Sequence, residues 1–212
     1  MSPTLYYSPG SCSLAPHIVL EEIGLPYALS LASTSDGTTQ SPAHLRLNPK
    51  GRVPVLVTGA SVLTEAPAIL LHLAISNPTT NLLPNTADGL VRSIEWFNWL
   101  SGTVHAVAIR QIWRPASFSR DPSHHNDIIA VGKTNLEAAF ALIEARMSGC
   151  TWAVGTCYTT VDPYLLVVFR WGNRVGFNMR KQYTAWTQHA LRVLERPAVE
   201  RALEQEGISV WE

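Results

Sequence analysis

The sequence of 212 residues has little charge, no excess of either sign and no long apolar run. Charged residues make up only 15% of it, and Lys plus Arg equals Asp plus Glu at 16 each. This balance lacks the basic excess typical of nucleic-acid binding. The apolar runs are all shorter than the roughly 18 residues that cross a bilayer. We therefore expect neither a nucleic acid nor a membrane as a partner.

Cysteine is also scarce, with only Cys12, Cys150 and Cys157. An odd number of cysteines argues against a disulfide framework, and their spacing matches no common metal site, so we expect no metal. The first residues, MSPTLYYSPG, have neither a basic segment nor an apolar core. We therefore expect no signal peptide and a cytoplasmic location.

What is present is hydrophobic sequence, 46% of the chain, with clear periodicity over residues 1–76. Strands are predicted at TLYY, YALSLA, VPVLV and SVL, and helices at SLAPHIVLEEIG, SPAHLRLN and EAPAILLHLAIS. The resulting order, β-α-β-α-β-β-α, is typical of an α/β thioredoxin-like domain.

The remaining sequence has helical patterns only. Residues 77–88, NPTTNLLPNTAD, contain two prolines and no periodicity, which predicts a linker. Residues 89–212 begin with a long helix, LVRSIEWFNWLSGTVHAVAIRQIW, and contain a largely apolar helix, TTVDPYLLVVFRWG, that we expect to be central. The sequence therefore predicts an all-α C-terminal domain.

A possible site for an anion follows the first strand, in YSPGSCSLAP. Because proline is tolerated in the first turn of a helix, Pro16 predicts a helix that starts near Ser11 to Ser13. Free N–H groups and the positive end of the helix dipole favour a thiolate there. We expect the pKa of Cys12, or of a bound substrate thiol, to be lowered. The alternative is that Ser11 or Ser13 caps the helix and Cys12 has no role.

Two further segments could hold a peptide-like ligand. In NPKGRVPVL, a cis bond between Val53 and Pro54 would expose the Val53 backbone to an extended peptide, and the alternative is a trans proline at a sheet edge. In LTEAPAIL, Glu65 precedes a helix. It could receive a ligand's ammonium group while the helix N–H groups take a carboxylate, or it could only cap the helix.

Together these segments resemble the glutathione S-transferases, and YYSPGSCSLAPHIVLEE is most similar to the bacterial beta class. The resemblance implies that Tyr7 and Cys12 lie beside the sulfur of glutathione. Which of Tyr7, Ser11 and Cys12 contacts the sulfur stays open. Cys12 could also form a mixed disulfide with glutathione.

The other two segments match the family motifs N-P-x-G-x-V-P and T-E-[GS]. This match implies that the backbone of Val53, next to Pro54, pairs with the cysteinyl unit of glutathione. It also implies that Glu65 holds the γ-glutamyl amine. Ala66 stands where the family has Gly or Ser, so a hydroxyl contact is lost.

The resemblance extends into the helical part of the sequence. His105 matches a histidine of the beta class that reaches the glutathione sulfur, while Ala106 stands in place of the lysine that follows it. Trp113, Phe118 and Trp171 lie where the resemblance places the second-substrate pocket, or they belong to the core.

A capping box is predicted at the start of the central helix, in Thr159-Thr160-Val161-Asp162. In such a box Thr159 accepts from the N–H of Asp162, and the Asp162 carboxylate reaches back to the start of the box. We expect this to be a folding device without a catalytic role.

The resemblance implies that the protein is a glutathione transferase that acts in detoxification. Glutathione would be its co-substrate, and a small hydrophobic electrophile would be the second substrate. Residues 1–76 would bind glutathione, residues 89–212 would supply the second-substrate pocket, and the protein would form a homodimer. Two alternatives stay open. One is a glutathione-dependent isomerase or lyase on the same fold, and the other is a non-catalytic member that binds glutathione.

Overall fold

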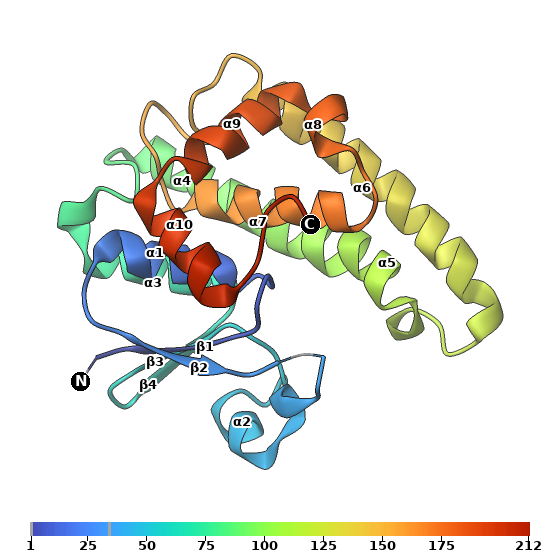
Figure 1. Ribbon diagram of the computed structural model, residues 1–212, viewed down its shortest axis with the longest axis horizontal. Coiled ribbons are helices and arrows are strands. Elements are labelled where there is room, and N and C mark those ends of the chain that lie inside the picture. Colours follow the sequence, from blue (N-terminus) through green and yellow to red (C-terminus); the bar gives the residue numbers. More distant parts are fainter. Residues whose placement is uncertain (1, 34) are drawn as a thin grey trace.

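The N-terminal part of the chain forms the predicted α/β domain in a computed structural model that describes residues 2–33 and 35–212 (Figure 1). Its elements, in order, are β1 (Thr4–Tyr7), α1 (Leu14–Ile23), β2 (Ala28–Leu31), η1 (Thr38–Gln40), α2 (Pro42–Leu47), β3 (Val55–Thr58), β4 (Ser61–Thr64) and α3 (Ala66–Ser76). The predicted order of strands and longer helices is confirmed.

The four strands form one mixed sheet in the order β2-β1-β3-β4. β1 is parallel to β2, and β3 is antiparallel to both β1 and β4. Because side chains alternate along a strand, β1 packs on both faces: Leu5 is buried on one, and Tyr6 contacts His44 of α2 on the other, with ring centroids 6.0 Å apart. Figure 1 shows α1 and α3 together on one side of the sheet and α2 on the opposite side.

The rest of the described chain is helical, as predicted. Its elements are η2 (Pro78–Thr80), α4 (Ala87–Asn98), η3 (Trp99–Ile109), α5 (Arg110–Trp113), η4 (Pro115–Ser117), η5 (Pro122–His124), α6 (His125–Met147), α7 (Val161–Arg174), α8 (Met179–Gln182), α9 (Thr184–Leu194) and α10 (Pro197–Glu206). No helix of the described residues is long and apolar enough to cross a membrane.

The long helix after the linker is continuous, but its middle segment is π-helical. α4, η3 and α5 follow one another without a break, and the residues at both junctions have α-helical backbone angles. π-Helical segments are rare and are often found at functional sites. The short helix α8 has only four residues, too few for a periodic pattern, and the sequence analysis did not predict it.

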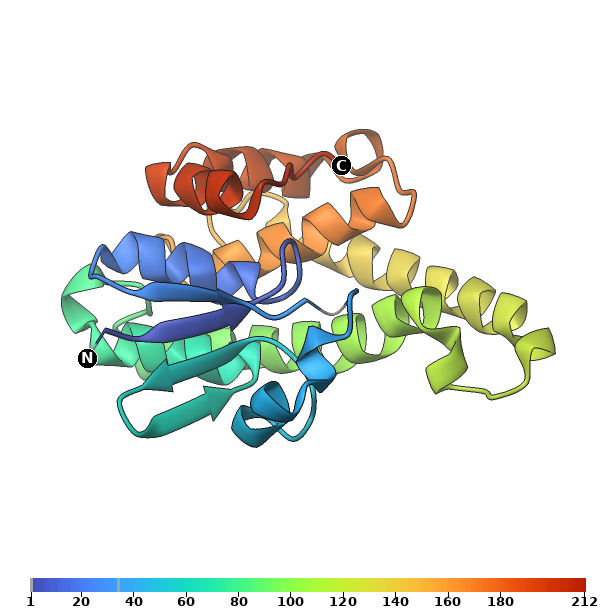
Figure 2. The ribbon, with the colours of Figure 1, turned by 60° about the horizontal axis from the view of Figure 1, so that its bottom comes forward.

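α7 is the central helix, which confirms the expectation from its apolar sequence. Residues 161–172 are all buried. The helix packs against α4, η3 and α9 in its own domain and against α1 of the α/β domain. Figure 2 shows α7 between the layer of α9 and α10 and the long helix on the other side. The two domains therefore share one core.

The capping box at the start of α7 forms with one difference from the prediction. Asp162 reaches back as expected, and its Oδ2 accepts from the Thr159 N–H at 2.6 Å. The Asp162 N–H bonds to the Thr159 carbonyl at 3.1 Å, so the Thr159 hydroxyl instead accepts from the Val161 N–H at 3.4 Å. Asp162 Oδ1 accepts from the Ala153 N–H at 2.9 Å and lies 2.7 Å from His189 Nε2.

Candidate functional site

A cavity of about 350 Å³ lies between the α/β domain and the long helix. The turn before α1, the loop before β3 and the start of α3 form one wall, and η3 and α5 form the other. The residues that the sequence analysis assigned to the glutathione site line this cavity except for Tyr7: Ser11, Cys12, Val53, Pro54, Glu65, Ala66 and His105. Segments far apart in the sequence therefore meet at one place.

Tyr7 lies elsewhere. On β1 it shares the face of Leu5, which is directed toward α1. Its ring packs against His17 of α1, with centroids 5.9 Å apart. The resemblance placed Tyr7 beside the sulfur together with Cys12, but the structure does not bring Tyr7 into the cavity lining.

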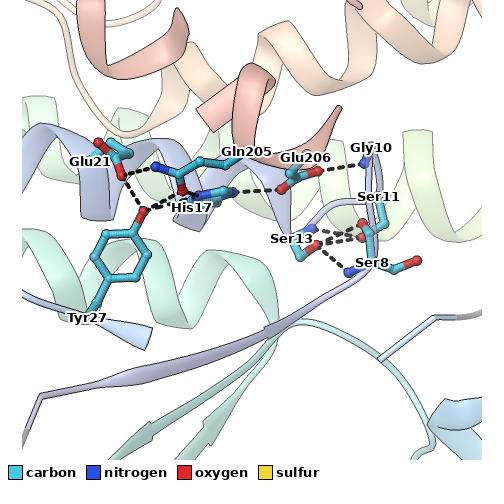
Figure 3. Close-up of polar contacts among 9 residues, drawn as sticks. All are labelled: Ser8, Gly10, Ser11, Ser13, His17, Glu21, Tyr27, Gln205 and Glu206. Carbon is cyan, nitrogen blue, oxygen red and sulfur yellow. Dashed lines mark hydrogen bonds and ion pairs between the residues drawn. The ribbon is translucent and has the colours of Figure 1, made fainter. Parts of the chain in front are cut away.

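The turn before α1 is closed by hydrogen bonds among its serines (Figure 3). Ser13 Oγ donates to the Ser8 carbonyl at 3.2 Å and lies 2.8 Å from Ser11 Oγ. Because a hydroxyl has one proton, Ser11 is the donor in that second contact. Neither serine caps α1, since Ser13 is at the N-cap position but makes no capping hydrogen bond. The hydroxyl proton of Ser11 is thus used inside the turn in the ligand-free protein.

Cys12 is buried and protonated in this structure. Its thiol donates to the Val53 carbonyl at 3.5 Å. Burial raises the pKa of Cys12 to about 12, although its own backbone N–H acts in the opposite direction. The expected lowering of this pKa is therefore wrong for the ligand-free protein, because the cost of removing a thiolate from water exceeds the stabilisation from nearby N–H groups.

Gly10 lies within this turn, between Ser8 and Ser11, and bonds to residues of the helical domain, among them Glu206 (Figure 3). Its N–H donates to Glu206 Oε2 at 2.7 Å, and its carbonyl accepts from Trp171 Nε1 at 2.9 Å. The other oxygen of Glu206 lies 2.8 Å from His17 Nδ1. Gly10 has a φ of 67°, which favours glycine. The sequence analysis missed Glu206, which is 196 positions from Gly10 and has no local motif.

Glu65 lies at the cavity edge with an exposed carboxylate. It precedes α3 with a φ of 73°, in a region that is costly for a non-glycine residue, and it makes no capping hydrogen bond. Its side chain is 66% exposed and forms an ion pair with Lys50. Capping alone therefore does not explain Glu65, and its carboxylate already holds an ammonium group.

The loop before β3 presents the Val53 backbone to the cavity. The peptide bond between Val53 and Pro54 is cis, as predicted. Asn48 Nδ2 donates to the Arg52 carbonyl at 2.8 Å, and His44 Nε2 lies 3.0 Å from the same oxygen. These side chains hold the loop from the side of α2 and so fix where Val53 lies.

The opposite wall consists of residues four or five apart along the long helix. His105 is in its middle, and its ring packs on Trp171 with centroids 4.5 Å apart. Burial, together with the charges of Arg52 and Arg110, lowers the pKa of His105 to about 4. His105 is therefore neutral at pH 7. The lining from this wall is Ser101, His105, Ala106, Ile109, Arg110, Trp113 and Arg114.

Of the aromatic residues expected near the second substrate, Trp113 and Trp171 line the cavity and Phe118 does not. The sequence analysis did not single out the arginines of the lining, Arg52, Arg110 and Arg114. A spacing of four residues places Arg110 and Arg114 on one helix face, and this was the signal that could have found them. Among the described residues, no group of three or more His, Cys, Asp or Glu is arranged to hold a metal ion.

A mixed sheet of this topology beside a helical domain, with this cavity between the two, defines the glutathione transferase class of proteins. The family models for the N-terminal and C-terminal domains of glutathione S-transferase match residues 1–75 and 117–197. The chain is 32% identical to glutathione S-transferase GST-4.5 of Xanthomonas campestris, over 97% of this chain and 99% of that protein. The chain therefore belongs to the glutathione S-transferase family.

Solved structures agree with this assignment. A sphingomonad glutathione S-transferase complexed with glutathione has a TM-score of 0.85 and 31% identity, over 97% of this chain and 100% of that one. A bacterial beta class enzyme from Sphingomonas chungbukensis has a TM-score of 0.83 and 29% identity, over 97% and 100%. The predicted fold, the transferase family and the similarity to the beta class are confirmed.

Proposed function

We propose that this protein binds glutathione in the cavity between its two domains and joins the glutathione sulfur to a small hydrophobic electrophile. The observation that carries the proposal is the meeting of Cys12, Val53, Glu65 and His105 around one cavity. Glutathione bound to a sphingomonad relative that aligns along nearly the whole chain supports it.

The polar groups of the cavity suit the parts of glutathione. The γ-glutamyl ammonium would replace Lys50 on the exposed carboxylate of Glu65. The N–H groups at the start of α3 would take the adjoining carboxylate. The cysteinyl unit would pair with the Val53 backbone, whose carbonyl accepts from the Cys12 thiol in the free protein. This arrangement leaves the glutathione sulfur near the start of α1.

The chemical step would be attack of the glutathione thiolate on the electrophile, with loss of the thiol proton to water and departure of the leaving group. The protein would favour the thiolate through the N-terminus of α1 and the guanidinium of Arg52. His105 is neutral, with a pKa of about 4. It would therefore act as a hydrogen-bond donor to the sulfur, because so weak a base removes protons poorly.

A second activity, thiol–disulfide exchange, is favoured by the position of Cys12. Cys12 lines the cavity, while Cys150 and Cys157 are exposed elsewhere. In the exchange, the Cys12 thiolate would break the S–S bond of glutathione disulfide, form a mixed disulfide and release one glutathione. Cys12→Ala should abolish the exchange and leave conjugation measurable, because only the exchange needs a protein sulfur. Survival of the exchange would exclude this second activity.

Calorimetry with glutathione tests the main proposal. Glu65→Ala should weaken binding roughly 10- to 100-fold, the cost of losing a charged hydrogen-bond partner. Glu204→Ala, which removes an exposed carboxylate of α10, is the matched control and should leave binding unchanged. An unchanged dissociation constant in Glu65→Ala would contradict the assignment of Glu65 to the γ-glutamyl amine. Consumption of glutathione during turnover separates a transferase from an isomerase or a lyase.

We also propose a cytoplasmic homodimer, with residues 1–76 and 89–212 as its two domains. Large apolar side chains are exposed on the adjacent elements β4, α3 and α4, namely Val62, Ile75, Val91 and Ile94. Such exposure supports a protein interface. The exposed free thiols of Cys150 and Cys157 support a reducing compartment. Light scattering of Ile75→Asp, which should be monomeric, tests the dimer.

A further inference from the structure

The helical wall of the cavity carries a pair of arginines without acidic partners. Arg110 and Arg114 are four residues apart and both line the cavity, as does Arg52 from the opposite wall. The pKa of Arg110 is lowered by burial and then by the charges of Arg52 and Arg114. Arg52 and Arg114 both line the same cavity as Arg110 and are close enough for their charges to act on it.

No acidic side chain of the described residues forms an ion pair with these arginines. None of the ion pairs among the described residues includes Arg52, Arg110 or Arg114. Arg110 Nε donates to Ser117 Oγ at 2.9 Å, which is a neutral partner. Glu65 is the acidic residue of the described lining, and it is paired with Lys50. Since like charges four apart on a helix destabilise it, this pair fits a site that receives an anion.

Bound glutathione would offset only part of the positive charge of the three arginines. Its two carboxylates would lie along the wall formed by the α/β domain, at the start of α3 and beside Arg52, which precedes the Val53 that pairs with the cysteinyl unit. Arg110 and Arg114 are on the opposite wall, across the place expected for the sulfur. They are therefore placed to meet the second substrate.

The neighbouring surface is aromatic. Trp113 lies between the two arginines in the sequence, is 42% exposed, and packs edge-on against Trp171 with ring centroids 5.6 Å apart. Both indole rings line the cavity. The exposed indole of Trp113 beside guanidinium groups suits a flat apolar molecule that carries a carboxylate, because Arg binds carboxylates through two parallel hydrogen bonds.

We propose that the second substrate is an anion: a flat aromatic or conjugated electrophile whose carboxylate is bound by Arg110 and Arg114 while the exposed ring of Trp113 contacts its apolar face. This inference rests on the proposed function, since it concerns the second substrate of the same cavity. It predicts a preference for charged over neutral molecules of equal shape.

Calorimetry with two probes of equal shape tests the preference without requiring turnover. The protein is first saturated with S-methylglutathione, which fills the wall of Glu65 and Arg52, and is then titrated with 4-nitrobenzoate or with the neutral 4-nitrobenzamide. The wild type should bind the benzoate at least about tenfold more tightly than the amide. Arg110→Gln and Arg114→Gln should each lose most of that ratio. Arg120→Gln removes an exposed arginine outside the lining and should keep it.

The outcomes separate the two proposals. If S-methylglutathione does not bind, the proposed function fails. If it binds but the two probes bind equally, or if both arginine variants keep the preference, the anionic substrate is excluded while glutathione binding stands. If Arg110→Gln and Arg114→Gln weaken the binding of S-methylglutathione rather than that of the benzoate, these arginines belong to the glutathione half of the cavity, and the inference is overturned.

Discussion

Asp162 and Glu206 are two buried carboxylates with nearly the same surroundings. Both side chains are completely buried. Each lies within 2.8 Å of a nitrogen of a buried histidine: Asp162 next to His189 at 2.7 Å and Glu206 next to His17 at 2.8 Å. Each also accepts from a backbone N–H, at 2.6 Å for Asp162 and 2.7 Å for Glu206. Their local chemistry therefore does not distinguish their roles.

What differs is where their partners lie. The partners of Asp162 are all in the helical domain, where they fix the start of the central helix α7. Glu206, at the end of α10, bonds to His17 of α1 and to Gly10, two positions before Cys12. The same arrangement thus stabilises a core helix at one place and shapes the site at the other. Substitutions at the two positions should have different consequences.

The largest expected effect is a loss of stability in Asp162→Ala. Asp162→Ala leaves the N–H groups of Ala153 and Thr159 and the Nε2 of His189 without their buried partner, at about 1–3 kcal/mol for each group and about 3–5 kcal/mol in total. We expect this decrease in the free energy of unfolding in urea titrations. Asp127→Ala, at an exposed position in the first turn of α6, is the control and should stay near the wild type. A loss below about 1 kcal/mol in Asp162→Ala would contradict the role assigned to the capping box.

Glu206→Ala should affect activity more than stability, which is the contrast that separates the two carboxylates. Glu206→Ala leaves one backbone N–H, that of Gly10, unpaired where Asp162→Ala leaves two, so we expect it to cost only about 1–3 kcal/mol of stability. The displaced turn should reduce kcat/KM for conjugation by about 10- to 100-fold, as small misplacements of a reacting group do. Glu206→Gln keeps an acceptor for Gly10 and should fall between Glu206→Ala and the wild type. The proposed difference between the two carboxylates would be contradicted if Glu206→Ala and Asp162→Ala lost equal stability and the folded Glu206→Ala protein kept a normal kcat/KM.

The smallest effect concerns the rate of alkylation of Cys12. Because the thiolate reacts and burial raises the pKa of Cys12 to about 12, Cys12 should react with iodoacetamide at pH 7.5 more slowly than the exposed Cys150 and Cys157. The rate of Cys12 should still be rising with pH above about 9. Mass spectrometry of each labelled peptide gives the rates.

The same measurement sharpens the comparison of carboxylates. In Glu206→Ala the turn before α1 is released, so Cys12 should become exposed and react faster. In Asp162→Asn, a milder change at the other carboxylate, its rate should stay slow as long as the protein is folded. Fast labelling of Cys12 in the wild type would contradict a buried thiol with a raised pKa and would support the lowered pKa expected from the sequence.

The parts of the site that the sequence predicts are those that depend on neighbours along the chain. Val53-Pro54, Glu65 and the capping box of Asp162 are each recognisable within a few residues, because turns and caps form over such short distances. Tyr7 packs against His17 of α1 because strand alternation directs its side chain there, and the motif alone does not show which face of the strand is which. Short-range signals therefore predict the fold and one wall of the cavity.

The remaining parts depend on tertiary packing. The π-helical segment η3 changes which side chains share a face, so the spacing of His105 and Arg110 does not follow an α-helical pattern. The pKa of Cys12 depends on how much the other domain buries it, which no local pattern gives. Glu206 lies far along the chain from the turn that it holds. Only the assembled structure brings these groups together.

The bond between Gly10 and Glu206 also has a consequence for the order of events during synthesis. The two residues are 196 positions apart. At about 5–20 residues per second, the ribosome adds Glu206 roughly 10 to 40 s after Gly10. The turn that carries Ser11 and Cys12 can therefore reach its final shape only after α10 has been synthesised and has docked on α1. The site is thus among the last parts of the protein to be completed on the ribosome.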